Sequence, residues 1–113
     1  MSVRHEVRLW AAQRLTAAIL GLCVIVHLAT IVYAVRGGLS GAEILARTRA
    51  NPGFAAFYAV FAVSAALHAA IGLRTIAAEW LGFRGEAAEF VMTVAGLVLT
   101  IAGLRAVWAL FGA

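Results

Sequence analysis

Two histidines interrupt long apolar runs of this sequence and are the side chains most able to do chemistry there. His27 lies in the run 15–35, and His68 lies in the run 54–73. Ionisable side chains at membrane depth are costly and usually mark function. One interpretation is a hydrogen bond between helices. The other is ligation of a metal or a haem iron, for which neutral imidazole is a common axial ligand.

The residues around His68 favour the haem interpretation. Ser64, His68 and Gly72 follow one another at four-residue steps, so on a helix they share one face. A glycine one turn from the ligand leaves room for a flat macrocycle, and Arg74 ends the apolar run where a haem propionate needs a cation. The third histidine, His5, lies in the polar N-terminus, where we expect no special role.

His27 and His68 are not expected to bind the same iron. A helix rises 1.5 Å per residue, which puts His27 about 18–20 Å from Arg14 and His68 about 9 Å from Arg74. If Arg14 and Arg74 mark the same interface, the two rings differ in depth by about 10 Å. A haem on His68 must therefore take its second axial ligand from another chain.

The elements that position these residues follow from composition. The chain has 113 residues, of which 65% are hydrophobic and 12% are charged, far from ordinary globular usage. The apolar runs suit helices that cross a bilayer, which takes about 20 residues, and they lack the alternation of a transmembrane barrel. The first run is too long for a signal peptide and is expected to be retained. We predict an all-α membrane protein of one domain, residues 1–113, with three transmembrane helices at approximately 11–36, 53–80 and 86–111.

The first loop predicts a short additional helix at the membrane interface. Ser40 followed three residues later by Glu43 is a capping-box pattern. The segment 51–53, Asn-Pro-Gly, is a stop signal. An interfacial helix at roughly 41–50 is therefore expected between the first two membrane helices. Small residues at four-residue spacing, Ala17 with Gly21 and Gly96 with Thr100, offer faces for close helix packing.

The arginines predict the orientation of the chain. Five are expected at the N-terminal end of the first helix or between the second and third, against three on the other side, or four with Arg105 near the end of the last helix, which favours a cytoplasmic N-terminus. The net charge of +4 is assigned to these membrane flanks and not to nucleic-acid binding. The arginines expected on the cytoplasmic side are Arg4, Arg8, Arg14, Arg74 and Arg84, and those on the opposite side are Arg36, Arg47, Arg49 and Arg105.

Two segments resemble a known family. The sequences QRLTAAIL, from Gln13, and HAAIGLRTIAAE, from His68, are similar to the motifs H-R-x-S-G and H-x-x-x-G-I-R-H-x-x-x-D. These motifs belong to the cytochrome b membrane-anchor subunit of the succinate dehydrogenase and fumarate reductase family. The resemblance spans residues 13–79. The chain departs from the motifs at Gln13, at Thr16-Ala17 and at Thr75, where the family has histidine, Ser-Gly and histidine.

The resemblance implies roles for individual residues. His68 matches the family's haem b ligand, and Arg14 matches the arginine beside the quinone and the haem propionates, so Arg14 and Thr16 are expected to bind quinone. Arg74, Gly72 and Ser64 are expected to contact a haem propionate or to line the haem pocket, with Glu79 at the place of the motif aspartate. His27 has no counterpart in the family's single-haem pattern, so we expect it to make an interhelical hydrogen bond, with ligation of a second haem as the alternative.

The resemblance also implies a function for the whole chain: a haem b-binding anchor of a succinate:quinone oxidoreductase, with one haem shared with a second hydrophobic anchor subunit. The anchor would dock a flavoprotein subunit and an iron–sulfur subunit on a bacterial inner membrane, help to form the quinone site, and hold no complete catalytic centre of its own. Three alternatives stay open. They are a haem-free anchor or a dihaem anchor of a fumarate reductase-type complex, and a small oligomeric transporter or channel subunit. All five acidic residues lie outside the apolar runs, which argues against proton-coupled export.

Overall fold

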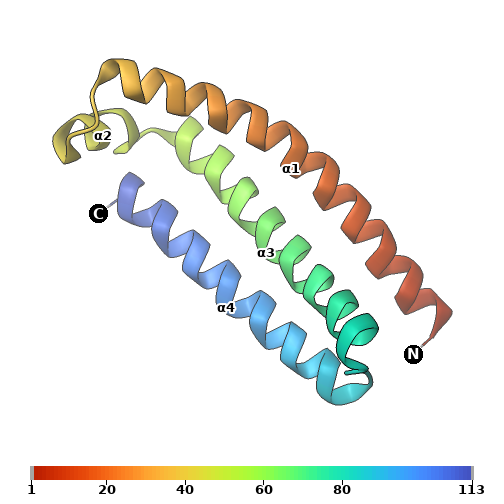
Figure 1. The fold of residues 1–113 in the computed structure, drawn as a ribbon. Helices are drawn as coiled ribbons and strands as arrows, with labels where there is room; N and C mark the ends of the chain where they lie inside the picture. The colour runs from red at the N-terminus through yellow and green to blue at the C-terminus, as the bar shows by residue number, and fades with distance from the viewer. Residues whose placement is uncertain (1, 113) are drawn as a thin grey trace.

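A computed structural model describes residues 2–112 as four helices with no strand among them (Figure 1). The predicted all-α architecture is confirmed, with three long apolar helices and a short one in the first loop. The long helices have the length and composition needed to cross a membrane. In chain order the elements are α1 Val3–Gly37, α2 Gly41–Thr48, α3 Pro52–Leu81 and α4 Glu86–Phe111.

The first helix begins earlier than predicted, at Val3 and not near residue 11. The hydroxyl of Ser2 caps it by accepting a hydrogen bond of 3.1 Å from the backbone N–H of His5. Glu6 lies in the first turn, where a carboxylate suits the helix dipole. The apolar run measures the part of the helix that suits hydrocarbon, whereas the helix itself continues for about two more turns of polar residues.

The short helix α2 starts as its capping box predicts and ends two residues early. The backbone N–H of Glu43 donates to the hydroxyl of Ser40 at 3.1 Å, and the helix ends at Thr48 where residue 50 was expected. Before the cap, Gly38 has a φ of 107°, and a Cβ there would overlap the Glu43 carboxylate. The carboxylate is the end of a flexible, exposed side chain that can move aside, so it is the positive φ that favours glycine at the entry to α2.

The end of α2 is tied to the end of α4. The hydroxyl of Thr48 donates to the carbonyl of Leu110 at 2.7 Å, and the backbone N–H of Ala50 donates to the carbonyl of Phe111 at 2.8 Å. These bonds satisfy carbonyls at a helix C-terminus that have no partner within their own helix. They also hold α2 across one end of the bundle, at the end opposite the N-terminus (Figure 1).

The helix α3 packs between α1 and α4 (Figure 1). Small residues make the α3–α4 contact: a Cβ at Gly96 would lie 3.2 Å from the Cβ of Ala70, and one at Gly103 would lie 2.9 Å from the Cβ of Ala62. Gly96 thus serves packing within the chain, whereas Gly21 has no such neighbour within 4 Å. The buried apolar residues of the described chain are all small: Cys23, Ala66, Ala70, Ala77 and Ala88.

The dimensions of the bundle suit a bilayer. It measures 49 × 25 × 23 Å, and a bilayer is about 40–45 Å thick with its headgroup layers. Many large apolar side chains on all three long helices are exposed. Lipid or other membrane proteins must therefore cover most of this surface.

Candidate functional site

His68 is held by α1 through one of its two ring nitrogens. Its Nδ1 atom lies 3.2 Å from the hydroxyl oxygen of Thr16. Thr16 is 5% exposed and His68 is half-buried. The other nitrogen, Nε2, forms no hydrogen bond with any residue between 2 and 112. The arrangement leaves one nitrogen anchored to the protein and one available to a ligand.

Two of the three residues expected to share a face of α3, His68 and Gly72, lie beside α1. Ser64 is buried at 6% exposure, and a Cβ at Gly72 would lie 3.5 Å from Nε2 of Gln13 on α1. The space beside Gly72 is therefore bordered by a flexible amide side chain. The buried Oε1 atom of this amide has no hydrogen-bond partner in the described chain. Gln13, which stands at the place of a motif histidine, thus carries a polar atom without a hydrogen-bond partner near Gly72.

Arg14 and Thr16 are not brought together in one pocket. Residues two apart on a helix are about 200° apart around its axis, so Thr16 faces α3 while Arg14 points away. Arg14 is exposed, and its guanidinium carbon lies 5.7 Å from the ring centroid of Trp10, a cation–π distance. Within this chain, the two expected quinone residues lie on different faces of α1.

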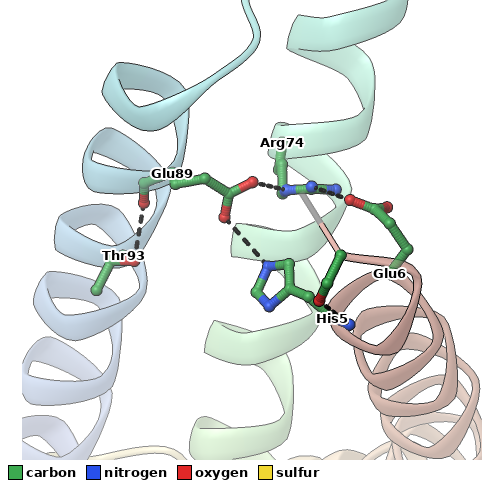
Figure 2. A network of polar contacts seen from close by, with 6 residues as sticks. His5, Glu6, Arg74, Glu89 and Thr93 are labelled. Atoms are coloured by element: carbon green, nitrogen blue, oxygen red, sulfur yellow. Dashed lines mark hydrogen bonds and ion pairs between the residues drawn. The ribbon is translucent and has the colours of Figure 1, made fainter.

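Arg74 joins all three long helices through ion pairs (Figure 2). Its Nε donates to Oε1 of Glu89 on α4 at 2.5 Å, and its Nη2 donates to Oε1 of Glu6 on α1 at 2.6 Å. The ring of His5 approaches the same cluster, with Nε2 at 3.5 Å from Oε2 of Glu89, an ion pair when the imidazole is protonated. The hydroxyl of Thr93 donates to the backbone carbonyl of Glu89 at 2.8 Å.

This charged cluster was not predicted from the sequence. His5 was expected to have no special role, and the structure places its ring beside Glu89. Arg74 was expected to face a haem propionate, and such a group would have to share its guanidinium with two carboxylates. The available signal was charge: Glu6 and Glu89 lie at the same end of neighbouring helices as Arg74.

His27 makes an interhelical hydrogen bond to Tyr58. Its Nδ1 atom lies 2.9 Å from the Tyr58 hydroxyl, and its ring stands edge-on to that of Phe61 with centroids 5.5 Å apart. A cavity of about 670 Å³ adjoins this pair. Tyr58 was missed in the sequence, although a tyrosine inside an apolar run carries a hydroxyl that needs a partner.

The two membrane histidines lie far apart in depth. His68 lies opposite Thr16 and His27 lies opposite Tyr58, so their levels differ by the ten residues from Tyr58 to His68, or about 15 Å. The separation is larger than the 10 Å expected, and it excludes one iron bound by both. No group of three or more His, Cys, Asp or Glu side chains in the described range can hold a metal. A haem iron on His68 could not take His27 as its other axial ligand.

One comparison with known proteins gives a match. The family model described as "Succinate dehydrogenase/Fumarate reductase transmembrane subunit" matches residues 1–109. No curated protein and no solved structure matches the chain significantly.

Proposed function

This chain belongs to the family of succinate dehydrogenase/fumarate reductase transmembrane subunits, and from that membership we propose that it is the haem b-binding anchor of a succinate:quinone oxidoreductase. It is a multi-pass membrane protein. In the proposed complex, a flavoprotein subunit and an iron–sulfur subunit carry out succinate oxidation. The chain and a second hydrophobic anchor hold them on a bacterial inner membrane, with the N-terminus on the cytoplasmic side.

The observation that carries this proposal is the environment of His68. Its Nδ1 is hydrogen-bonded to Thr16, and its Nε2 has no partner among residues 2–112. A ligating histidine typically has its second nitrogen fixed in this way. His27 is about 15 Å away along the bundle, so the second axial ligand comes from the partner anchor and the haem is shared.

The neighbouring residues fit a haem at this place. Small side chains, Ser64 and Gly72, lie on the His68 face, and the buried end of the Gln13 amide lacks a partner. Because the oxygen and nitrogen of an amide are assigned and not observed, that end can equally offer an N–H donor to a propionate. A bound haem supplies one-electron chemistry, while His68, Gln13 and Arg74 hold and orient it.

Arg14 is the residue we propose for the quinone. It is exposed at the end of the bundle that carries the N-terminus, where a quinone headgroup can meet electrons from the iron–sulfur subunit. A guanidinium offers up to five N–H donors, which stabilise a carbonyl oxygen as negative charge develops on it during reduction. Thr16 lies on the other side of α1, so Arg14 alone is proposed to contact the quinone.

Haem spectra of the assembled complex test the proposal. We expect a reduced-minus-oxidised spectrum with haem b bands that disappear in His68→Ala. A matched control is His5→Gln, because His5 is the histidine outside the apolar runs; its bands should match those of the wild type. Unchanged bands in His68→Ala, or a wild-type complex without haem, would overturn the assignment.

A further inference from the structure

The hydroxyl of Thr16 has three neighbours and one hydrogen to share among them. Its oxygen lies 2.8 Å from the carbonyl of Ala12, 3.1 Å from the carbonyl of Gln13 and 3.2 Å from Nδ1 of His68. Both carbonyls belong to the helix that carries Thr16 and accept hydrogen bonds without donating any. The proton and the lone pairs of this hydroxyl must therefore be divided between its own helix and α3.

The shortest of these contacts indicates where the hydroxyl hydrogen of Thr16 points. A threonine in a helix commonly donates to the carbonyl three or four residues earlier, and the 2.8 Å contact with Ala12 has that geometry. With its hydrogen directed there, the oxygen can offer only a lone pair to His68. The contact with Nδ1 is then a hydrogen bond only if Nδ1 carries the proton.

We propose that Thr16 is a positioning residue that fixes His68 as the Nδ1-protonated tautomer, so that Nε2 presents its lone pair to a metal ion. In neutral imidazole one nitrogen is a donor and the other is an acceptor, and the hydrogen bond made by one nitrogen selects the role of the other. Thr16 is 5% exposed, so water competes little for this bond. The tautomer depends on this chain alone, whereas the identity of the metal as haem iron rests on the proposed function.

This arrangement also affects the strength of the ligand. A ring N–H that donates to an oxygen orients the imidazole and raises the basicity of the opposite nitrogen. Loss of the Thr16 hydroxyl should therefore weaken the hold on haem and favour the ferrous over the ferric state. The role differs from the quinone contact that the motif implies for Thr16, because it acts on the haem ligand.

Three variants of the assembled complex separate these roles. Thr16→Val removes the hydroxyl at nearly constant volume, and Thr16→Ser keeps it. Thr30→Val is the matched control, since the hydroxyl of Thr30 on the same helix donates to the carbonyl of Val26 at 2.9 Å and has no partner on another helix among residues 2–112. We expect Thr16→Val to release haem to apomyoglobin about 10-fold faster and to raise the haem midpoint potential. Thr16→Ser and Thr30→Val should stay near the wild type.

The outcomes distinguish a failure of this inference from a failure of the proposed function. If His68→Ala loses haem while Thr16→Val matches Thr30→Val, the role of Thr16 is wrong and the ligand assignment stands. If Thr16→Val lowers only quinone reduction, with haem release and midpoint potential unchanged, Thr16 acts on quinone and the inference is overturned.

The tautomer of His68 can be determined by NMR without haem. In the full-length chain prepared haem-free with ¹⁵N-labelled histidine, the resonances of His68 are identified as those absent from His68→Gln. We expect a protonated Nδ1 and an unprotonated Nε2 in the wild type, and the loss of this single form in Thr16→Val. A proton on Nε2 in the wild-type chain would contradict the proposal.

Discussion

The guanidinium of Arg74 on α3 and the carboxylate of Glu89 on α4 are joined at 2.5 Å, and the same guanidinium holds Glu6 of α1. The side chains of Arg74 and Glu89 are 18% and 27% exposed, whereas that of Glu6 is 51% exposed. The Arg74–Glu89 pair is therefore the more shielded of the two, and Glu6 attaches α1 to it from the solvent side. One arginine thus connects three helices whose apolar contacts involve mainly small residues.

Replacing Arg74 should loosen this end of the bundle. We expect Arg74→Gln to lower the thermal midpoint of the assembled complex by about 2–4 °C, the scale of losing a partly shielded ion-pair network. Glu89→Gln should lower it similarly, and the double variant should add little, because both changes break one interaction. Arg84→Gln is the control, since Arg84 lies at the same end and forms no ion pair with another described residue.

The same variants show whether Arg74 also serves the haem. If the guanidinium acts only between helices, the haem b bands of Arg74→Gln and Glu89→Gln should both match those of the wild type. A loss or shift of the bands confined to Arg74→Gln would mean that a propionate shares this arginine. Equal thermal midpoints for Arg74→Gln and Arg84→Gln would contradict the role of the ion pairs.

The order of α2 should depend on pH through Glu43. Hydrogen bonds from the hydroxyl and the backbone N–H of Ser40 lower the pKa of the Glu43 carboxyl below its ordinary value of 4.5. The folded state therefore favours the charged carboxylate, and its contribution is full above that ordinary pKa and is lost as pH falls through the lower folded one. We expect α2 to loosen between about pH 5 and pH 3.

A spin label on α2 measures this change. With Cys23 replaced by Ala and the exposed Ala46 replaced by Cys for labelling, the label should become more mobile as pH falls through that window. Glu43→Gln should give a label whose mobility does not change across this window, because the amide cannot be ionised. A label whose mobility keeps the same pH dependence in Glu43→Gln would refute the role of this carboxylate, and Glu86→Gln at the start of α4 should leave the wild-type profile unchanged.

The sequence predicted the structural features that depend on residues close together in the chain. The three membrane helices follow from apolar runs of bilayer length, and the start of α2 follows from Ser40 and Glu43 three residues apart. The start of α1 was missed because the polar character of residues 3–10 shows only that they lie outside the hydrocarbon. It does not show their backbone conformation, which is helical from the cap at Ser2 onward. Local pattern therefore predicted which helices form better than it predicted where they begin.

The contacts between helices were harder to predict because they depend on rotation and register. Thr16 and His68 are 52 residues apart, and whether Thr16 or Arg14 faces α3 depends on how α1 is turned about its axis. A motif that places Arg14 and Thr16 two residues apart in sequence cannot supply that rotation. The partners of Arg74 on α1 and α4 were missed for the same reason, although each charge was visible in the sequence.

Arg14 is expected to matter for quinone reduction more than for assembly. We predict that Arg14→Ala lowers quinone reductase activity by about 10- to 1000-fold, the scale of losing one oriented donor to a developing negative charge. Succinate oxidation with an artificial acceptor that takes electrons upstream should stay near the wild-type rate. Arg8→Ala is the control, an exposed arginine less than two turns away on α1. An equal loss of both activities in Arg14→Ala would indicate a structural role.

The last prediction concerns His27, whose hydrogen bond to Tyr58 joins α1 and α3 at 2.9 Å. A hydrogen bond of this kind inside a membrane contributes about 0.6–2 kcal/mol. We expect His27→Phe and Tyr58→Phe to destabilise the complex by similar small amounts, with a coupling energy in that range when the two are combined. His27→Gln, which keeps a polar side chain, should lose less than His27→Phe.

Haem counted per complex decides between the two interpretations of His27. If the hydrogen bond to Tyr58 is the whole role of the imidazole, His27→Gln and Tyr58→Phe should each leave the haem content at the wild-type value. A second haem would use the Nε2 atom of His27, and a fall from two haems to one in His27→Gln would then show that the residue is a ligand. Tyr58→Phe separates the cases further, because it removes the hydrogen bond to Nδ1 and leaves the ligating nitrogen in place. Under the hydrogen-bond interpretation the two variants differ little, whereas under the ligand interpretation only His27→Gln loses a haem.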